Sequence, residues 1–269
     1  MKERTLLKIA SFNVNGIKAR IITLLKWLKE TKPDIVVLQE IKSTNEAFPK
    51  GEIEDLGYNV VTHGQKSFNG VAILSLFPID TTKTGLNGNP EDVQSRWIEA
   101  EINDLLVCGL YLPNGNPCPG PKFDYKLQWM ERLYDRAYEI ILSEQATIML
   151  GDYNVIPQKE DAANPMLWLE DALYHYETRS RFRRILNLGF TDAFRSLYPN
   201  EKAFTFWDYQ KGSWQKNNGI RIDHALLSPQ AADRLISCQI DSYLRGEEKP
   251  SDHVPIWIEI NEKDQRGVS

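Results

Sequence analysis

Short apolar runs, separated by turn residues, recur along this chain. This pattern limits the folds that the chain can adopt. They include "LLKIASFNV", "DIVVLQE", "YNVVTHG", "NGVAILS", "RWIEAEI", "DLLVCGLYLPNG", "ATIMLGDYNV", "RIDHALLS" and "VPIWIEI". Runs of this kind, rich in Val and Ile, are typical of β-strands. Many short strands with few helices between them predict an α+β fold. We expect a four-layer sandwich, in which two packed, mostly antiparallel β-sheets are flanked by helices.

Longer segments carry apolar residues at helical spacing. The stretch "ARIITLLKWLKETKP" has this pattern, and Pro33 marks its end; residues 122–144 and 179–190 have the same spacing. We see no linker, low-complexity segment or internal repeat. We therefore predict one domain over residues 1–262, followed by a short disordered tail at 263–269.

Composition excludes several classes of protein. The 42% of apolar residues can form a substantial core, and no run is long enough to span a membrane or to act as a signal peptide. The cysteines Cys108, Cys118 and Cys238 lack the paired spacing of a zinc site, so we expect a cytoplasmic protein. The net charge of −5 argues against a protein that coats nucleic acid, but permits an enzyme with a local positive groove.

Six of the apolar runs share a second feature, because each of them carries an acid, amide, phenol or imidazole side chain at one end. Asp152 and Asn154 follow "TIML" with only Tyr153 between them, although such residues also end strands in ordinary turns. The full set predicts a single site at one edge of the sheets and comprises Asn13, Asn15, Glu40, Tyr111, Asn114, Asp152, Asn154, Asp223, Asp252 and His253.

The chemistry of this set points to phosphodiester hydrolysis. Oxygen ligands without thiolates favour Mg²⁺, with Mn²⁺ as a substitute, over zinc. A carboxylate can take the proton of water, while amide, phenol and imidazolium groups stabilise the developing charge on phosphorus oxygens. We find no Ser or Cys nucleophile beside a base, and no phosphate-binding glycine loop of the P-loop kind.

Several motifs together resemble the exonuclease III family of apurinic/apyrimidinic (AP) endonucleases. They are "SFNVNG", "LQEIK", "GVAILS", "YLPNG", "GDYNV", "TFWDY", "GIRIDH" and "SDHVP", in the family's order and over nearly the whole chain. The resemblance implies the DNase I-like sandwich and a Mg²⁺-dependent catalytic domain that cleaves DNA 5′ to abasic sites. It also implies 3′-to-5′ exonuclease, 3′-phosphatase and 3′-phosphodiesterase activities. The expected partner is double-stranded DNA with abasic sites or blocked 3′ ends, and we expect a monomer.

The resemblance also implies roles for the strand-end residues. Asp152 orients or deprotonates the attacking water, and Asn154 binds a phosphate oxygen. His253 lies against the scissile phosphate with Asp223 accepting from its other nitrogen, and Tyr111 donates to a phosphate oxygen. Glu40 is the principal metal ligand, and the metal set as a whole is Asn13, Glu40, Asp152, Asn154, Asp252 and His253.

Substrate contacts are expected from Asn114, Lys42 and Arg96, which touch the DNA, and from an apolar niche for an extrahelical abasic sugar. By the resemblance Phe206, Trp207 and Ile220 line this niche, whereas core packing is the alternative for "FTFWDY" and the expectation for Phe204. The cluster Arg179, Arg181, Arg183 and Arg184 is interpreted equally well as a solvated helix face or as a phosphate contact.

Two rival functions stay open at this point. The chain could be another phosphohydrolase of the same superfamily that acts on a lipid or inositol phosphate, although "TFWDY" and "GIRIDH" favour the AP endonuclease branch. It could also be a DNA-binding module without activity, but such a module has no need of a water-activating carboxylate at Asp152.

Overall fold

The computed structural model describes residues 6–262, whose strands form two six-stranded sheets. The predicted tail at 263–269 lies outside the described residues. The first sheet has the order β11-β12-β1-β2-β4-β3 and contains β1 (Leu6–Asn13), β2 (Ile35–Gln39), β3 (Asn59–His63), β4 (Val71–Ser75), β11 (Leu235–Ile240) and β12 (Ile256–Asn261). The second has the order β5-β6-β7-β8-β10-β9 and contains β5 (Thr81–Thr84), β6 (Trp97–Ile102), β7 (Leu105–Tyr111), β8 (Thr147–Asp152), β9 (Thr191–Asp192) and β10 (Asp223–Leu227).

Both sheets follow the same strand plan. In each, a strand leads through a helix to a parallel neighbour: β1 through α1 (Ile17–Thr31) to β2, and β7 through α3 (Pro121–Ser143) to β8. The other neighbours in both sheets are antiparallel. The predicted, mostly antiparallel sandwich is therefore confirmed, with one parallel pair at the centre of each sheet.

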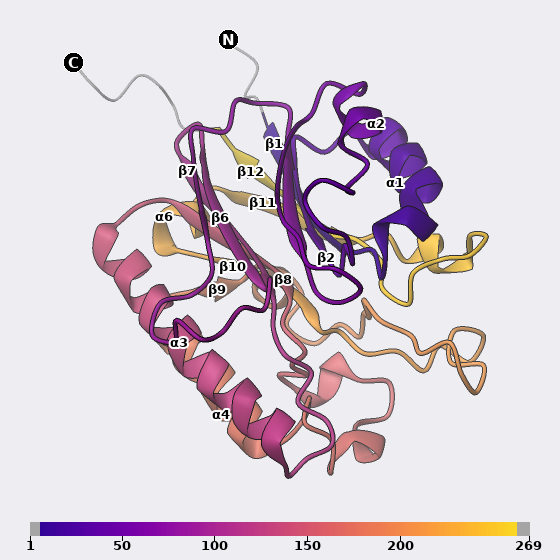
Figure 1. Cartoon of the computed structure of the whole chain (residues 1–269). Coiled ribbons are helices and arrows are strands. Elements are labelled where there is room, and N and C mark those ends of the chain that lie inside the picture. Colours follow the sequence, from indigo (N-terminus) through magenta and orange to yellow (C-terminus); the bar gives the residue numbers. More distant parts are fainter. Residues whose placement is uncertain (1–5, 263–269) are drawn as a thin grey trace.

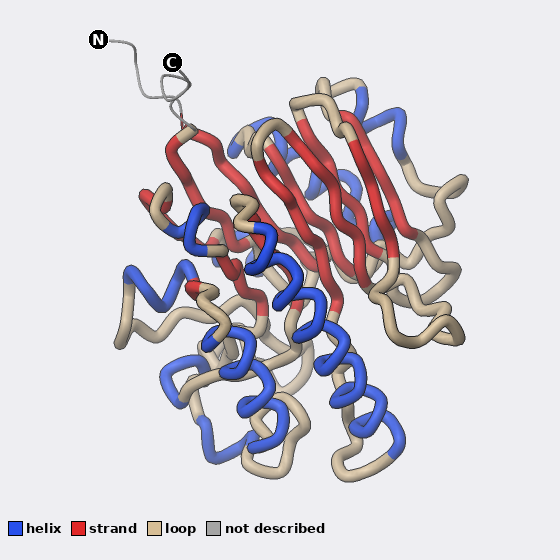
Figure 2. Tube along the Cα trace, turned by 90° about the vertical axis from the view of Figure 1, so that its left-hand side faces the viewer, coloured by secondary structure: helices blue, strands red, loops and turns tan. Residues whose placement is uncertain are grey.

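The inner faces of the two sheets pack against each other and form the main core. Ile9 and Val37 from the first sheet and Val107, Ile148 and Leu150 from the second are fully buried in one cluster. The alternate residues of β2 face the outer helices instead, which explains why "IVVL" is apolar without interruption. Figure 2 shows strands lying side by side, with the long helix α3 in front of them.

Helices cover the outer faces of the sandwich (Figure 1). On the first sheet, α1 buries Leu24, Trp27 and Leu28, and α2 (Lys50–Glu54) adds Ile53. On the second sheet, α3 and α4 (Tyr176–Asn187) pack side by side. The connections hold α5 (Ala193–Leu197), α6 (Pro229–Ala232), η1 (Lys159–Asp161), η2 (Pro165–Trp168) and η3 (Ser242–Gly246). No helix in the described part of the chain has the length and apolar character needed to cross a membrane.

Some elements escaped the sequence patterns for physical reasons. β5 is an exposed edge strand of sequence "TTKT" with no apolar face, and β9 has only two residues. β11 alternates weakly and depends on pairing with β12, with a register shift between Leu235 and Ser237. α4 begins before the predicted segment, because the His175 side chain accepts a hydrogen bond from the Glu177 backbone N–H and caps it.

Candidate active site

The first sheet brings three of the predicted side chains to one edge. Asn13 ends β1 and Glu40 follows β2, and these parallel strands end together because Asn13 lies opposite Gln39. β12 runs antiparallel to β1, so His253, just before β12, lies at the same edge.

The second sheet contributes a matching row. Tyr111 and Asp152 end the parallel strands β7 and β8 and lie opposite each other. Asp223 begins the antiparallel strand β10 directly opposite Asp152. The predicted clustering of strand ends therefore holds across both sheets, because parallel strands end where their antiparallel neighbours begin.

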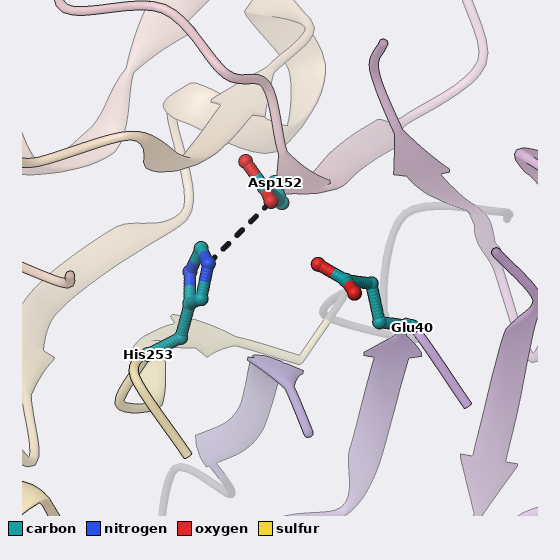
Figure 3. A group of neighbouring side chains, drawn as sticks. All are labelled: Glu40, Asp152 and His253. Atoms are coloured by element: carbon teal, nitrogen blue, oxygen red, sulfur yellow. Dashed lines mark ion pairs between the residues drawn. The ribbon is translucent and has the colours of Figure 1, made fainter. Parts of the chain in front are cut away.

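The carboxamide of Asn13 joins the two sheets. Its Nδ2 donates to Glu40 Oε1 and Asp152 Oδ2, both at 3.0 Å, and lies 3.4 Å from His253 Nε2. Figure 3 shows Glu40, Asp152 and His253 converging on one space, and each offers an atom within 4.8 Å of the other two. This group could hold a metal ion.

The ring of His253 is paired on both sides with buried carboxylates. Nδ1 lies 2.8 Å from Asp223 Oδ2, and Nε2 lies 3.7 Å from Asp152 Oδ2. Burial disfavours a charged ring, but Asp223 and then Asp152 outweigh it and raise the pKa of His253 to about 10. Burial likewise raises the pKa of Asp152, against the attraction of the His253 cation. The ring is therefore an imidazolium at neutral pH, with a proton on each nitrogen.

A second branch of the network runs outward from Glu40. Lys42 Nζ lies 2.9 Å from Glu40 Oε2 and also donates to Asn15 Oδ1, while Asn15 Nδ2 donates to Asp252 Oδ1 at 2.9 Å. Although burial opposes it, the hydrogen bond from Asn13 and the Lys42 cation hold the pKa of Glu40 below its ordinary value. Glu40 is thus a carboxylate at neutral pH, and Asp252 is linked to it through Asn15 and Lys42.

Asp152 and Asn154 lie together at the end of β8, and a turn of the backbone joins them. Tyr153 packs between the sheet and the helices, whereas Asn154 has a left-handed backbone with φ 47° and donates its N–H to Asp152 Oδ1 at 2.9 Å. The Asn154 carboxamide is held on both sides, since Oδ1 accepts from Asn114 Nδ2 at 3.2 Å and Nδ2 donates to the Leu112 carbonyl at 2.9 Å.

The neighbouring strand leaves no room for a side chain at Gly151. A Cβ at this position would lie 2.0 Å from the backbone oxygen of Leu110. The glycine therefore allows the β7 backbone to approach closely.

Tyr111 faces the carboxylates and Arg96 covers its ring. Burial, Glu40 and Asp152 raise the pKa of the Tyr111 phenol well above its ordinary value, so the phenol keeps its proton and can donate it. The Arg96 guanidinium lies 4.7 Å from the ring centroid and donates to the Tyr111 carbonyl at 3.1 Å.

Among the residues expected to form the niche, Phe206 alone meets the site. Its ring centroid is 5.0 Å from that of His253, and its backbone bridges both Ile220 and His253. Trp207 is 2% exposed and packs on Phe204 and Trp214, on the other side of the same backbone. Ile220 is 1% exposed in a small apolar cluster.

The arginine cluster on α4 makes contacts within α4 and with the neighbouring helix α3. Arg181 pairs with Glu177 and Glu131, and Arg184 pairs with Glu131, which lies on α3. Arg179 stacks 4.4 Å above the ring of Tyr174. These contacts favour the interpretation as a helix face over phosphate binding.

Several residues that support the site were not among the predicted site residues. Ser251 Oγ donates to the Asn13 carbonyl at 2.8 Å, and Thr205 Oγ1 accepts the backbone N–H of Asp223 at 3.1 Å. Lys126 of α3 is fully buried, with Nζ 2.6 Å from the Asn154 carbonyl oxygen. Hydroxyls and a helical lysine are usually solvated, so only the packing reveals these contacts.

Comparison with known proteins agrees with this geometry. The profile of the Endonuclease/Exonuclease/phosphatase family matches residues 10–253, from β1 to the site histidine. The chain belongs to this family. It is 36% identical to exodeoxyribonuclease III of Haemophilus influenzae, over 94% of this chain and 100% of that protein.

Solved structures of relatives have the same fold. An AP endonuclease from Archaeoglobus fulgidus superposes with a TM-score of 0.91 and 39% identity, covering 96% of this chain and 100% of that one. The 3′ phosphatase NExo from Neisseria, bound to a product DNA hairpin, superposes with a TM-score of 0.92 and 34% identity, covering 95% of this chain and 100% of that one. The DNase I-like sandwich predicted for this family member is confirmed.

Proposed function

We propose that this protein is a divalent-metal-dependent DNA repair nuclease that hydrolyses the phosphodiester bond 5′ to abasic sites. We further propose that it removes nucleotides, phosphates and phosphodiesters from 3′ ends. The observation that carries this proposal is the Asn13 carboxamide bonded to both Glu40 and Asp152 beside the His253 ring. The likeness to exodeoxyribonuclease III over 94% of the chain supports the choice of substrate.

In this proposal the carboxylate of Asp152 takes a proton from the attacking water. Its position at the end of β8, bonded by Asn13 and by the Asn154 N–H, supports this role, since these contacts orient the carboxylate. Burial raises the pKa of Asp152 to about 7, and a general base works best when its pKa lies near the operating pH. The His253 imidazolium, held by Asp223, donates to the phosphate and offsets the charge that develops there. Tyr111 and Asn154 are the neutral donors to the remaining phosphate oxygens.

Glu40 and Asp152 would hold the metal ion. A bound divalent ion would offset the phosphate charge, and Mg²⁺ suits these oxygen ligands, with Mn²⁺ as a substitute. The acidic excess fits a cation, because the carboxylates of Glu40, Asp152, Asp223 and Asp252 outnumber the Lys42 and His253 cations.

The remaining residues of the expected metal set play other parts. His253 carries protons on both nitrogens, so we assign it to the phosphate. The Asn154 carboxamide has protein partners on both sides, and Asn13 bonds the ligands themselves. Asp252 contributes negative charge through Asn15.

Recognition of the abasic sugar is assigned to Phe206. Its ring stands beside His253, and it is partly exposed whereas Trp207 and Ile220 are buried. An apolar wall can accept a sugar that has no base. It offers an intact nucleotide no hydrogen bonds to offset the free energy of unstacking its base. Lys42, Arg96 and Asn114 are proposed contacts to the DNA backbone.

We also infer that residues 6–262 act as one catalytic unit and that the protein works as a cytoplasmic monomer. The two sheets share one core and one site, which supports the first inference. The free thiols of Cys108, Cys118 and Cys238 support a reducing compartment.

The test is cleavage of a DNA duplex that carries one abasic analogue, with Mg²⁺ or with chelator, followed by sizing of the products. We expect a single Mg²⁺-dependent cut on the 5′ side of the lesion, and no cut by Asp152→Asn. A duplex with a 3′-phosphate end tests the second activity. Cleavage of an inositol polyphosphate in place of DNA would instead assign the chain to another branch of the family.

A matched comparison tests the niche. Phe206→Ala should lower the ratio of abasic to undamaged cleavage at constant salt, whereas Phe204→Leu, in the core, should leave that ratio unchanged. An unchanged ratio in Phe206→Ala would remove Phe206 from substrate recognition.

A further inference from the structure

A buried lysine lies behind the loops that follow β7 and β8. Lys126 is 0% exposed, and its Nζ donates to the carbonyl oxygens of Asn114 at 2.9 Å and Asn154 at 2.6 Å. Within residues 6–262 it forms no ion pair with a carboxylate, and burial lowers the pKa of Lys126 to about 7. Burying an amino group on two carbonyls alone costs stability, so the contact needs another reason than stability.

The two carbonyls belong to residues whose side chains bond to each other. Asn114 Nδ2 donates to Asn154 Oδ1 at 3.2 Å, and Asn154 Nδ2 donates to the Leu112 carbonyl at 2.9 Å. Asn154 also has a left-handed backbone with φ 47°. Lys126 donates to the backbone carbonyls of both residues whose carboxamides bond to each other, and so restrains the position of both carboxamides.

The loop after β7 is shaped around the lysine stem. Gly115 has φ +91°, and a Cβ there would lie 2.6 Å from Lys126 Cδ, so no larger residue could follow Asn114. The next residue, Asn116, donates to Asp171 Oδ1 at 3.0 Å and accepts from the Ala172 N–H at 3.1 Å. Lys126 therefore holds this loop at Asn114, and the bonds to Asp171 and Ala172 hold it at Asn116.

We propose that Lys126 is a positioning residue, which holds the Asn114–Asn154 pair in the orientation that receives the scissile phosphate. The proposal rests on the function proposed above, because it takes Asn154 as a phosphate ligand. Without the ammonium, substrate still binds through the rest of the site, but the carboxamides are misplaced when the phosphate reacts.

The test compares Lys126→Met with Lys122→Met. Methionine keeps the apolar stem of Lys126 and removes the ammonium, whereas Lys122 is an exposed lysine in the first turn of the same helix. A misplacement of about 1 Å can cost on the order of 100-fold in rate. We expect kcat on the abasic duplex to fall about 10- to 100-fold in Lys126→Met with little change in KM, and Lys122→Met to match the wild type.

A double-mutant cycle separates positioning from a general loss of structure. Asn154→Gly removes the carboxamide and tolerates the left-handed backbone. If Lys126 acts through that carboxamide, Lys126→Met should change kcat less than about twofold in the Asn154→Gly background, because the two effects share one route. A full, multiplicative loss would overturn the proposal, as would a wild-type kcat in Lys126→Met alone. If Lys126→Met does not fold, Lys126→Gln replaces it in the same cycle, since its amide can still donate to one carbonyl.

The cycle is also run on bis(4-nitrophenyl) phosphate, a minimal phosphodiester. A wild-type protein that hydrolyses this compound but not abasic DNA would contradict the proposed function, while the cycle would still decide the role of Lys126. A wild type active on DNA together with an unaffected Lys126→Met would contradict only the positioning role.

Discussion

The Asp223–His253 pair determines the charge of the ring assigned to the phosphate, and Asp223→Asn tests that assignment. Asparagine keeps the shape and can still accept from Nδ1, but it removes the negative charge 2.8 Å from the ring. A buried hydrogen bond to a charged group is worth about 1.5–3 kcal/mol, which corresponds to about one to two pKa units at 1.36 kcal/mol per unit. The pKa of His253, about 10 in the wild type, should therefore fall to between about 8 and 9.

The loss is limited because a second carboxylate remains. Asp152 Oδ2 lies 3.7 Å from Nε2 and continues to favour the imidazolium. At pH 7 the ring should stay cationic in the variant, and kcat should fall only modestly. Above pH 8 to 9 the variant should lose activity about tenfold per pH unit, whereas the wild type should keep its activity until close to pH 10.

Two measurements check this prediction. The ring ¹H–¹³C signal of His253, followed by NMR against pH in metal-free protein, gives its pKa directly, and kcat against pH gives the functional counterpart. Asp233→Asn, at an exposed carboxylate beyond α6, is the matched control. An unchanged pKa of His253 in Asp223→Asn would refute the idea that Asp223 holds the ring cationic.

Other parts of the molecule allow further predictions. Asp152→Asn should lower kcat about 10²- to 10⁴-fold while DNA binding, measured by gel shift, stays intact or tightens. Glu40→Ala should move the Mg²⁺ concentration for half-maximal cleavage well upward, because it removes the ligand best placed to fix the ion. His224 is buried, and burial followed by the Arg221 cation lowers its pKa from 6.5 to about 4. Between pH 6.5 and 4 the His224 side chain is therefore protonated in the unfolded chain but neutral in the folded chain. The free energy of unfolding falls over this range by up to roughly 3 kcal/mol. His224→Gln can replace its contacts to Val155 and Arg221 and should flatten this part of the curve of unfolding free energy against pH.

Each of these predictions has a result that would contradict it. Near-normal cleavage by Asp152→Asn would remove it as the base, and an unchanged Mg²⁺ titration would remove Glu40 as a ligand. Urea unfolding of His224→Gln at several pH values should be compared with that of the wild type. Equal acid sensitivity of wild type and His224→Gln would mean that other groups control acid unfolding.

Much of the site was predictable from the sequence, because it depends on local periodicity. A strand ends where its apolar run ends, so Asn13, Glu40 and Asp152 could be recognised as strand-end groups one strand at a time. Oxygen and nitrogen donors without thiolates then limit the chemistry, whatever the arrangement of the strands. The family motifs added the order of these residues along the chain and the expected role of each.

Other features depend on which segments pack together, and sequence periodicity does not encode that. "TFWDY" predicts aromatic residues near the site, but the backbone bridges at Phe206 turn its ring towards His253 and send Trp207 into the core. A lysine in an amphipathic helix is usually solvated, and Lys126 becomes buried only because the two site loops close over α3. The sequence by itself determined the strands, their polar ends and the kind of chemistry. Only the tertiary structure decided which ends meet and what holds them, because hydrogen bonds and burial act between residues far apart in the chain.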